Sequence, residues 1–263
     1  MHKTEPRKAP RATALAAAGI LAGAALGAGA AQGPSDWQFN AIVYGWLPSV
    51  SGDLRYDRPR AGDGFTVDAA DILDDLQFTF MFTLEARKGP WLAFTDVIYL
   101  DLEGDKSRSV SLPEGGSIEL FDADVSMSGW LWTLAGGYNF WRHDGSWADA
   151  FAGLRLFSVE SDAKLTGVLG RERKASVSDD IWDGIIGVKG RFALADRWFL
   201  PYYADIGTGD SDTTWQLAGG VGYTFHWGEV ALLYRYLQYD QGDDKLLQGV
   251  SFGGPMLAVG FRF

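Results

Sequence analysis

Apolar residues occupy every second position along much of the chain beyond residue 36. The clearest example lies in residues 77–87, where Phe78, Phe80, Phe82 and Leu84 alternate with other residues. A helix would scatter these four side chains around its circumference, whereas a strand places them on one face. The pattern therefore predicts β-strands with one apolar face.

Segments of this kind recur along the chain, and we expect ten strands. One of them, residues 91–102, is apolar on both faces, so alternation does not fix its register. The predicted strands are residues 37–48, 77–87, 91–102, 125–140, 147–158, 178–192, 198–207, 213–225, 229–239 and 250–263.

Short and long links alternate between the predicted strands. This rhythm and the even strand number predict an antiparallel up-and-down transmembrane β-barrel with both termini of the chain on one side of the membrane. A β-sandwich or a soluble barrel is the rival architecture. The short links are residues 88–90, 141–146, 193–197 and 226–228, and the long ones are 49–76, 103–124, 159–177, 208–212 and 240–249.

The first long link, residues 49–76, leaves two alternatives open. Residues 53–56 and 65–67 are compatible with a further hairpin, which would give twelve strands instead of ten. Residues 68–76 are compatible with a short helix capped by Asp68, with Ile72, Leu73 and Leu76 on one face.

The last strand is apolar on one face, carries Gly260 and Arg262 on the other, and ends in phenylalanine. It resembles the closing strand of bacterial outer-membrane β-barrels. The resemblance implies that its apolar face is the signal read by the barrel-assembly machinery. The residues of that signal are Leu257, Val259, Phe261 and Phe263.

The first thirty residues have the pattern of a secretory signal peptide. A basic start is followed by an uncharged stretch rich in Ala, Leu and Gly, and Ala28–Gly29–Ala30 fits a cleavage site. We therefore expect residues 1–30 to be removed and residues 31–263 to form a single barrel domain. Later apolar runs are interrupted by charge or glycine before they reach the ~20 residues of a membrane helix.

Composition narrows the function classes. The net charge is −11, and it becomes −14 without residues 1–30, which argues against nucleic acid as a partner. The chain has no cysteine, which excludes disulfides and thiol chemistry. The aromatic fraction of 14% and the 34 glycines fit a barrel with one lipid face and one lumen face.

Charged residues lie on the predicted strand faces opposite the aromatics, which would place them in the lumen. A narrow barrel can be filled by side chains, and opposite charges in such a space would pair. The alternatives are a lumen filled by salt bridges and a lumen that conducts solutes. The predicted lumen charges are Glu85, Asp96, Arg155, Asp183, Lys189, Arg191, Asp205, Arg235 and Arg262.

Catalytic chemistry has little support in the sequence. His143 and His226 both fall in predicted short turns beside tryptophans, so a serine nucleophile on a long-loop edge would lack a base. We expect no enzyme activity and no cofactor, with an outer-membrane lipid-modifying enzyme as the weakest alternative. The acidic segments 210–212 and 240–244 offer oxygen ligands for Ca²⁺ but lack EF-hand spacing, so no metal site is predicted.

Several short segments, in order along the chain, resemble a family of uncharacterised proteobacterial outer-membrane β-barrel proteins. The resemblance implies a bacterial outer-membrane location, with contacts to membrane lipid and lipopolysaccharide, and names no solute or oligomeric state. We expect a structural or loop-mediated interaction role, with a narrow porin as the alternative. The matching segments are residues 44–46, 51–52, 71–74, 85–89, 96, 99, 152–155, 182–183, 204–207, 211–215, 234–236 and 254–255.

Overall fold

The computed structural model describes residues 37–54, 64–67, 70, 72, 76–111, 117–167, 172–241 and 247–263. The predicted signal peptide lies outside these residues. Of the segment that is compatible with a short helix, Ala70 and Ile72 are described as helical, and the remainder before Leu76 lies outside the described residues. Across the described part of the chain, no helix is both long and apolar enough to span a membrane.

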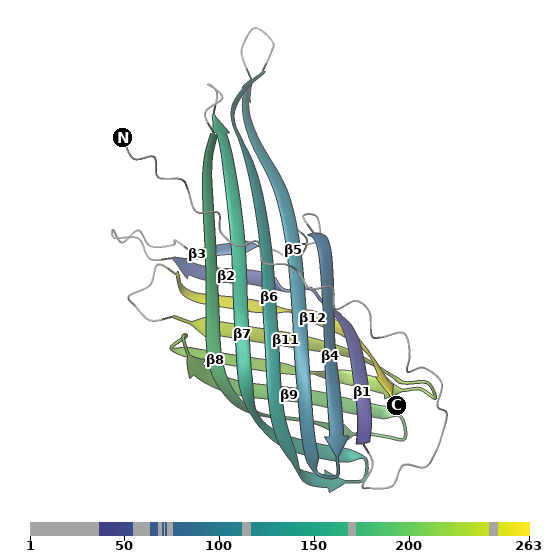
Figure 1. The fold of residues 1–263 in the computed structure, drawn as a ribbon. Helices are drawn as coiled ribbons and strands as arrows, with labels where there is room; N and C mark the ends of the chain where they lie inside the picture. The colour runs from purple at the N-terminus through teal and green to yellow at the C-terminus, as the bar shows by residue number, and fades with distance from the viewer. Residues whose placement is uncertain are drawn as a thin grey trace. The chain divides into compact units, whose positions relative to one another are not determined.

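Ten antiparallel strands form a closed barrel in which each strand pairs with its neighbours in sequence, and β12 returns to β1 (Figure 1). The prediction of a ten-stranded up-and-down barrel is confirmed. The ten strands are β1 (Trp37–Trp46), β4 (Leu76–Lys88), β5 (Trp91–Ser111), β6 (Ser117–His143), β7 (Ser146–Gly167), β8 (Glu172–Ala193), β9 (Trp198–Gly209), β10 (Thr213–Thr224), β11 (Glu229–Asp240) and β12 (Leu247–Arg262).

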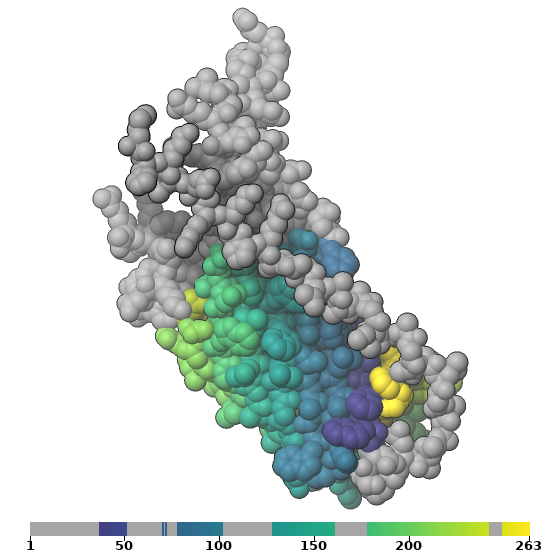
Figure 2. Space-filling view, viewed as in Figure 1, coloured from purple at the N-terminus to yellow at the C-terminus, as the bar shows by residue number. Residues whose placement is uncertain are grey.

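The barrel closes at the two ends of its strand order. β1 and β12 pair from Asn40 opposite Arg262 to Trp46 opposite Met256. Phe39 and Phe263 extend the pairing, because each backbone N–H donates to the carbonyl of the other at 2.9 and 3.0 Å. Figure 2 shows the last residues, in yellow, beside the purple residues of β1.

The further hairpin is also present, but it does not enlarge the ring. β2 (Ser49–Leu54) pairs with the part of β12 that extends past β1, and β3 (Gly64–Val67) pairs with β2. Pro48 separates β1 from β2 and cannot donate a ladder hydrogen bond, so the strand breaks there. The sheet therefore contains twelve strands, of which ten close the barrel.

Strands β5–β8 are longer than the sequence predicts. Residues 103–111, 117–124, 159–167 and 172–177 were expected in loops, and the structure places them in these four strands. These stretches are poorer in apolar residues than the rest of the barrel strands, although Val159, Ala163 and Leu165 still alternate with charged residues, and pairing with neighbours identifies all four stretches as strands. Figure 1 shows the four strands rising well beyond β9–β11 on the side of the long links.

The opposite end of the barrel has short turns. Gly89 adopts a positive φ of 59° between β4 and β5, and Asp144 and Gly145 have φ values of 45° and 78° between β6 and β7. Two consecutive residues with positive φ are typical of the tight hairpin turn that matches strand twist. The described loop residues thus place every short link at one end.

Candidate functional site

The lumen is the candidate functional site, because the polar side chains of the strands are buried there. Alternate residues of each strand point inward, so a charged residue on the inner face is enclosed by the ring. The buried polar and charged residues of the described barrel strands are Glu85, Thr133, Ser146, Asp149, Arg155, Asp183, Asp205, Thr214, Gln216 and Arg235.

The level nearest the long links is centred on Arg155 of β7. Its guanidinium forms an ion pair with Asp205 of β9, and both side chains are 0% exposed. Arg155 also donates to the hydroxyls of Thr133 at 3.5 Å and Thr214 at 3.4 Å. These contacts join β6, β7, β9 and β10 across the lumen.

Aromatic and aliphatic side chains complete this level. Tyr239 and Leu237 of β11 are each 1% exposed, and the ring of Tyr239 stacks on Phe157 at 5.1 Å between centroids. Ile181 and Leu131 belong to the same buried cluster. The lumen is therefore filled by packed side chains around Arg155.

Arg235 of β11 forms the next level toward the short turns. Its Nη2 lies 3.1 Å from Asp96 Oδ2, and its Nη1 donates to the Tyr44 hydroxyl at 3.2 Å. The Tyr44 hydroxyl in turn donates to Asp96 Oδ1 at 2.8 Å. Gln216 Oε1 accepts from Nε and Nη2 of the same arginine at 3.2 and 2.8 Å, and the guanidinium lies 4.9 Å from the Trp46 ring centroid.

A third level joins β4 to β7 and β8. Glu85 pairs with Lys189 and also lies 3.5 Å from Arg87. Arg87 Nη2 lies 2.7 Å from Asp149 Oδ2, and its guanidinium stacks over Trp147 at 4.4 Å. The carboxylates at this level are almost inaccessible, since Glu85 and Asp149 are 6% and 0% exposed.

The rim at the short turns carries the last ion pairs. Glu229 Oε2 lies 3.2 Å from Arg191 and 2.7 Å from Arg262. The Arg262 side chain is 55% exposed, whereas those of Glu229 and Arg191 are 17% and 18% exposed. Arg262 is thus at the mouth of the barrel and the other two are partly enclosed.

The structure brings most of the nine predicted lumen charges into these levels, with a different pairing for one of them. Asp183 was expected to pair with an opposite charge like the other lumen residues, but it accepts the backbone N–H of Ser211 at 3.0 Å and so fixes the β9–β10 turn. Arg262 is the one predicted lumen charge whose side chain is mostly exposed, at 55%.

Sequence reasoning missed three charged residues of the same faces. Arg87, Asp149 and Glu229 each lie an even number of residues from a predicted lumen charge on the same strand, namely Glu85, Arg155 and Arg235. Residues an even number of positions apart on a strand lie on the same face, so this alternation alone would have identified them as lumen residues.

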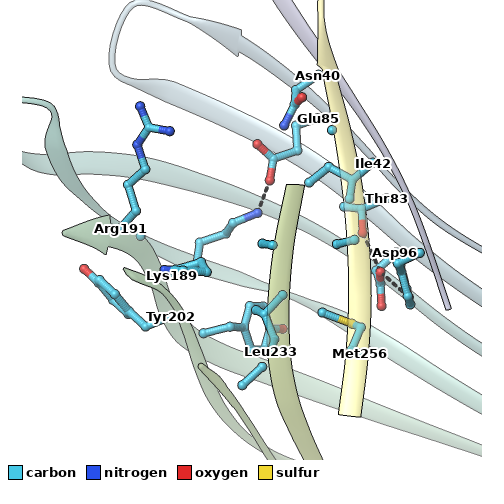
Figure 3. A pocket seen from close by; sticks show the side chains of 18 of the residues that line it. Asn40, Ile42, Thr83, Glu85, Asp96, Lys189, Arg191, Tyr202, Leu233 and Met256 are labelled. Atoms are coloured by element: carbon cyan, nitrogen blue, oxygen red, sulfur yellow. Dashed lines mark hydrogen bonds and ion pairs between the residues drawn. The ribbon is translucent and has the colours of Figure 1, made fainter. Parts of the chain in front are cut away.

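Below the Arg235 level the lumen encloses a cavity of about 180 Å³ (Figure 3). It extends from Tyr44, Gln216 and Arg235 to Arg191 and Glu229 at the rim. Most of its wall is apolar. The apolar and aromatic residues of the wall include Ile42, Phe94, Phe199, Ala231, Leu233, Met256 and Ala258.

The four residues of the predicted assembly signal lie on the outer face of β12. Leu257, Phe261 and Phe263 are 55%, 43% and 56% exposed, and Val259 is partly exposed. The Phe263 ring stacks on Phe39 at 6.2 Å between centroids. The signal therefore lies at the β1–β12 seam.

The histidines and acidic loops form no catalytic or metal constellation in the described residues. His143, predicted in a short turn, is instead the exposed last residue of β6, with Nε2 3.0 Å from Asp144 Oδ2, and His226 is exposed in the turn between β10 and β11. Asp210 Oδ2 accepts the backbone N–H of Trp182 at 2.9 Å. No three His, Cys, Asp or Glu side chains of the described residues are grouped to hold a metal ion, and residues 242–246 of the second acidic segment lie outside those residues.

No protein-family model matches the chain, and no curated protein matches it. Among solved structures, it is similar to the translocator domain of the autotransporter NalP from Neisseria meningitidis, with 15% identity, a TM-score of 0.42 and coverage of 89% of this chain and 90% of that one. It is also similar to the outer membrane protease OmpT from Escherichia coli, with 9% identity, a TM-score of 0.49 and coverage of 87% of this chain and 97% of that one. Ail, the attachment invasion locus protein of Yersinia pestis, has 12% identity, a TM-score of 0.36 and coverage of 86% of this chain and 98% of that one. Similarities at this level define neither a family nor a function for the chain.

Proposed function

We propose that the chain is an integral protein of the bacterial outer membrane. The observation that carries this proposal is the exterior of the barrel. Thirty large hydrophobic side chains of the described residues are exposed. At roughly 100 Å² each they present on the order of 3,000 Å², whereas the largest apolar patch of a soluble monomer is ~300–600 Å².

Aromatic residues mark two levels on this exterior. Trp182 and Phe192 lie ten residues apart on β8, a separation of about 33 Å along a strand and ~25 Å after a typical tilt. Trp132 contacts Trp182 with ring centroids 6.4 Å apart, and Trp141 contacts Phe192 at 6.3 Å, so β6 carries the same two levels. The spacing fits the apolar band of an outer-membrane barrel.

The outward positions between these levels are uncharged in every described barrel strand. On β8 they are Gly184, Ile186, Val188 and Gly190, while the charged residues Asp183, Lys189 and Arg191 alternate with them on the inner face. A soluble barrel would reverse this arrangement, because charged residues favour water and apolar residues the interior. The described exterior therefore favours lipid.

Site-directed spin labelling tests the membrane placement, and the absence of native cysteine makes single-cysteine variants straightforward. A label at Ile186→Cys, midway between the aromatic levels, should be accessible to oxygen and protected from a water-soluble nickel chelate. A label at Ala195→Cys, exposed in the β8–β9 turn, should show the reverse. Greater nickel accessibility at residue 186 than at residue 195 would contradict the proposal.

Within the membrane, the proposed role is structural or carried by the long-link side, with a closed lumen. The supporting observation is the level around Arg155, where the side chains of Arg155 and Asp205 are 0% exposed and form an ion pair, and where Arg155 also donates to the buried hydroxyls of Thr133 and Thr214. β5–β8 then offer a backbone platform beyond the membrane for contacts with lipopolysaccharide or other partners. Recognition of Leu257, Val259, Phe261 and Phe263 by the barrel-assembly machinery belongs to the same proposal.

A narrow channel is the second candidate, and the cavity below Arg235 favours it, because the lumen is not filled along its whole length. Liposome swelling separates the two roles. A closed barrel should leave swelling in small sugars at the rate of empty liposomes, whereas a channel should accelerate it in proportion to the protein added.

A further inference from the structure

We propose that the lumen cavity below Arg235 binds small, neutral, monocyclic aromatic molecules that carry one oxygen acceptor. The inference goes beyond the proposed membrane role and requires the barrel fold, but it does not require the lumen to be closed or open. Size is its first support. A cavity of about 180 Å³ is close to the ~150 Å³ apolar cavity that is known to accept benzene.

The wall chemistry favours an aromatic ring. Phe94 and Phe199 are 4% and 5% exposed and face the cavity from β5 and β9. Met256 and Leu233 line it from β12 and β11, and Figure 3 places both side chains beside the cavity. Aromatic edges and a thioether sulfur make favourable contacts with a ring, in addition to the burial of apolar area.

The charges of the wall favour a neutral ligand. Each of the six charged residues that line the cavity has an opposite partner within the same wall, so no charge is left for an ionic ligand to neutralise. Bringing an ion into this space would carry the desolvation cost without a compensating pair. The three pairs are Glu85–Lys189, Asp96–Arg235 and Glu229–Arg191.

Gln216 supplies a hydrogen-bond donor at the inner end. Its Oε1 accepts two hydrogen bonds from Arg235, which assigns the orientation of the amide and leaves Nε2 as the other end. In the described part of the chain, Nε2 donates no hydrogen bond. A phenolic oxygen that reached the inner end of the cavity would accept from it.

The entrance is at the short-turn end. Arg191 and Glu229 line both the cavity and the rim and are partly exposed, whereas Arg235 at the inner end is 4% exposed. A ligand therefore enters past the Arg191–Glu229 pair and stops at Arg235.

Binding of phenol to the folded protein in lipid nanodiscs tests the proposal, with NMR of methyl-labelled methionine as the readout. The chain has four methionines, so the Met256 methyl can be resolved. We expect a saturable shift of this methyl with a dissociation constant on the order of 0.1–1 mM, in the range that ligands of about seven heavy atoms reach. We also expect nuclear Overhauser effects between the phenol ring and this methyl.

Two variants and one control locate the site. Ala231→Leu adds carbon atoms to the cavity wall and should weaken binding at least tenfold, while Ala152→Leu, on the exposed outer face, should leave it unchanged. Gln216→Glu keeps an acceptor for Arg235 but removes the amide donor, so it should weaken phenol by ~3–10-fold and toluene by less.

Three results would overturn the proposal. They are a linear, non-saturable response in the wild type, equal binding by the wild type and Ala231→Leu, and a saturable response without any Overhauser effect at Met256. The last of these is measured on the wild type, so it decides even if Ala231→Leu fails to fold.

Discussion

Replacing Asp205 with alanine should leave the guanidinium of Arg155 buried in the lumen without an anionic partner. Both side chains are 0% exposed, and the hydrogen bonds that remain to Thr133 and Thr214 are long, at 3.5 and 3.4 Å, and to neutral oxygens. Removing one partner of a buried ion pair costs about 3–5 kcal/mol, because the other charge stays desolvated. We expect Asp205→Ala to lower the free energy of unfolding by this amount.

Replacing both partners should cost far less. Substituting a buried pair by apolar residues of similar volume is often neutral or stabilising by ~1–4 kcal/mol. The double variant Arg155→Met/Asp205→Leu should therefore be more stable than Asp205→Ala. The exposed Arg262 provides the control, and Arg262→Ala should change stability by about 0–1 kcal/mol.

Urea unfolding in lipid vesicles, followed by tryptophan fluorescence, measures these differences, because the chain has 11 tryptophans. If Asp205→Ala costs less than about 1 kcal/mol, as an exposed pair would, or if Arg155→Met/Asp205→Leu is less stable than Asp205→Ala, Arg155 and Asp205 are not a buried, coupled pair.

Four further substitutions test other parts of the barrel. Gly254→Ala should hinder closure of the β1–β12 seam, because a Cβ there would overlap the carbonyl oxygen of Leu47; a fully heat-modifiable variant on a gel would argue against this. Ile186→Lys should cost about 2–4 kcal/mol of stability in lipid, and Ser158→Lys at the level of Trp130 about 0–1 kcal/mol, with equal costs contradicting the lipid exterior. Phe263→Ala should reduce the folded fraction in cells more than the yield of refolding in detergent, and an equal effect in both would indicate a purely structural role.

The closed ring could be predicted from the sequence, because period-two alternation and the lengths of the links are local properties. The β5 register could not. Leu92, Phe94 and Ile98 point inward and pack with buried Ala135 and Phe151 or Leu131, so the lumen itself is apolar on this side. When both faces of a strand are buried or lie in lipid, hydrophobicity no longer distinguishes them.

The extension of β5–β8 was not predicted, although Val159, Ala163 and Leu165 alternate with charged residues in the β7 part of it. Its residues pair with neighbouring strands over the whole length, for example Asp105 with Asp124 and Ala163 with Ala175. Backbone hydrogen bonds to neighbouring strands hold these extensions in the sheet.

The identity of the ion-pair partners depends on how the strands are staggered around the ring. Glu85 and Lys189 are 104 residues apart in sequence, and Asp96 and Arg235 are 139 apart. The alternation of side chains along a strand places these four residues on the inner face, but strand number and stagger together decide which charges meet. That is why Asp183 could be placed inward while its partner, the backbone N–H of Ser211, could not be foreseen.

Ion conductance across planar bilayers tests the central claim most directly, namely that a membrane-spanning barrel is closed at the level of Arg155 and Asp205. Purified protein that inserts should produce no discrete conductance steps in 1 M KCl. Reproducible steps of constant size from the wild-type protein would contradict the claim and establish an open lumen.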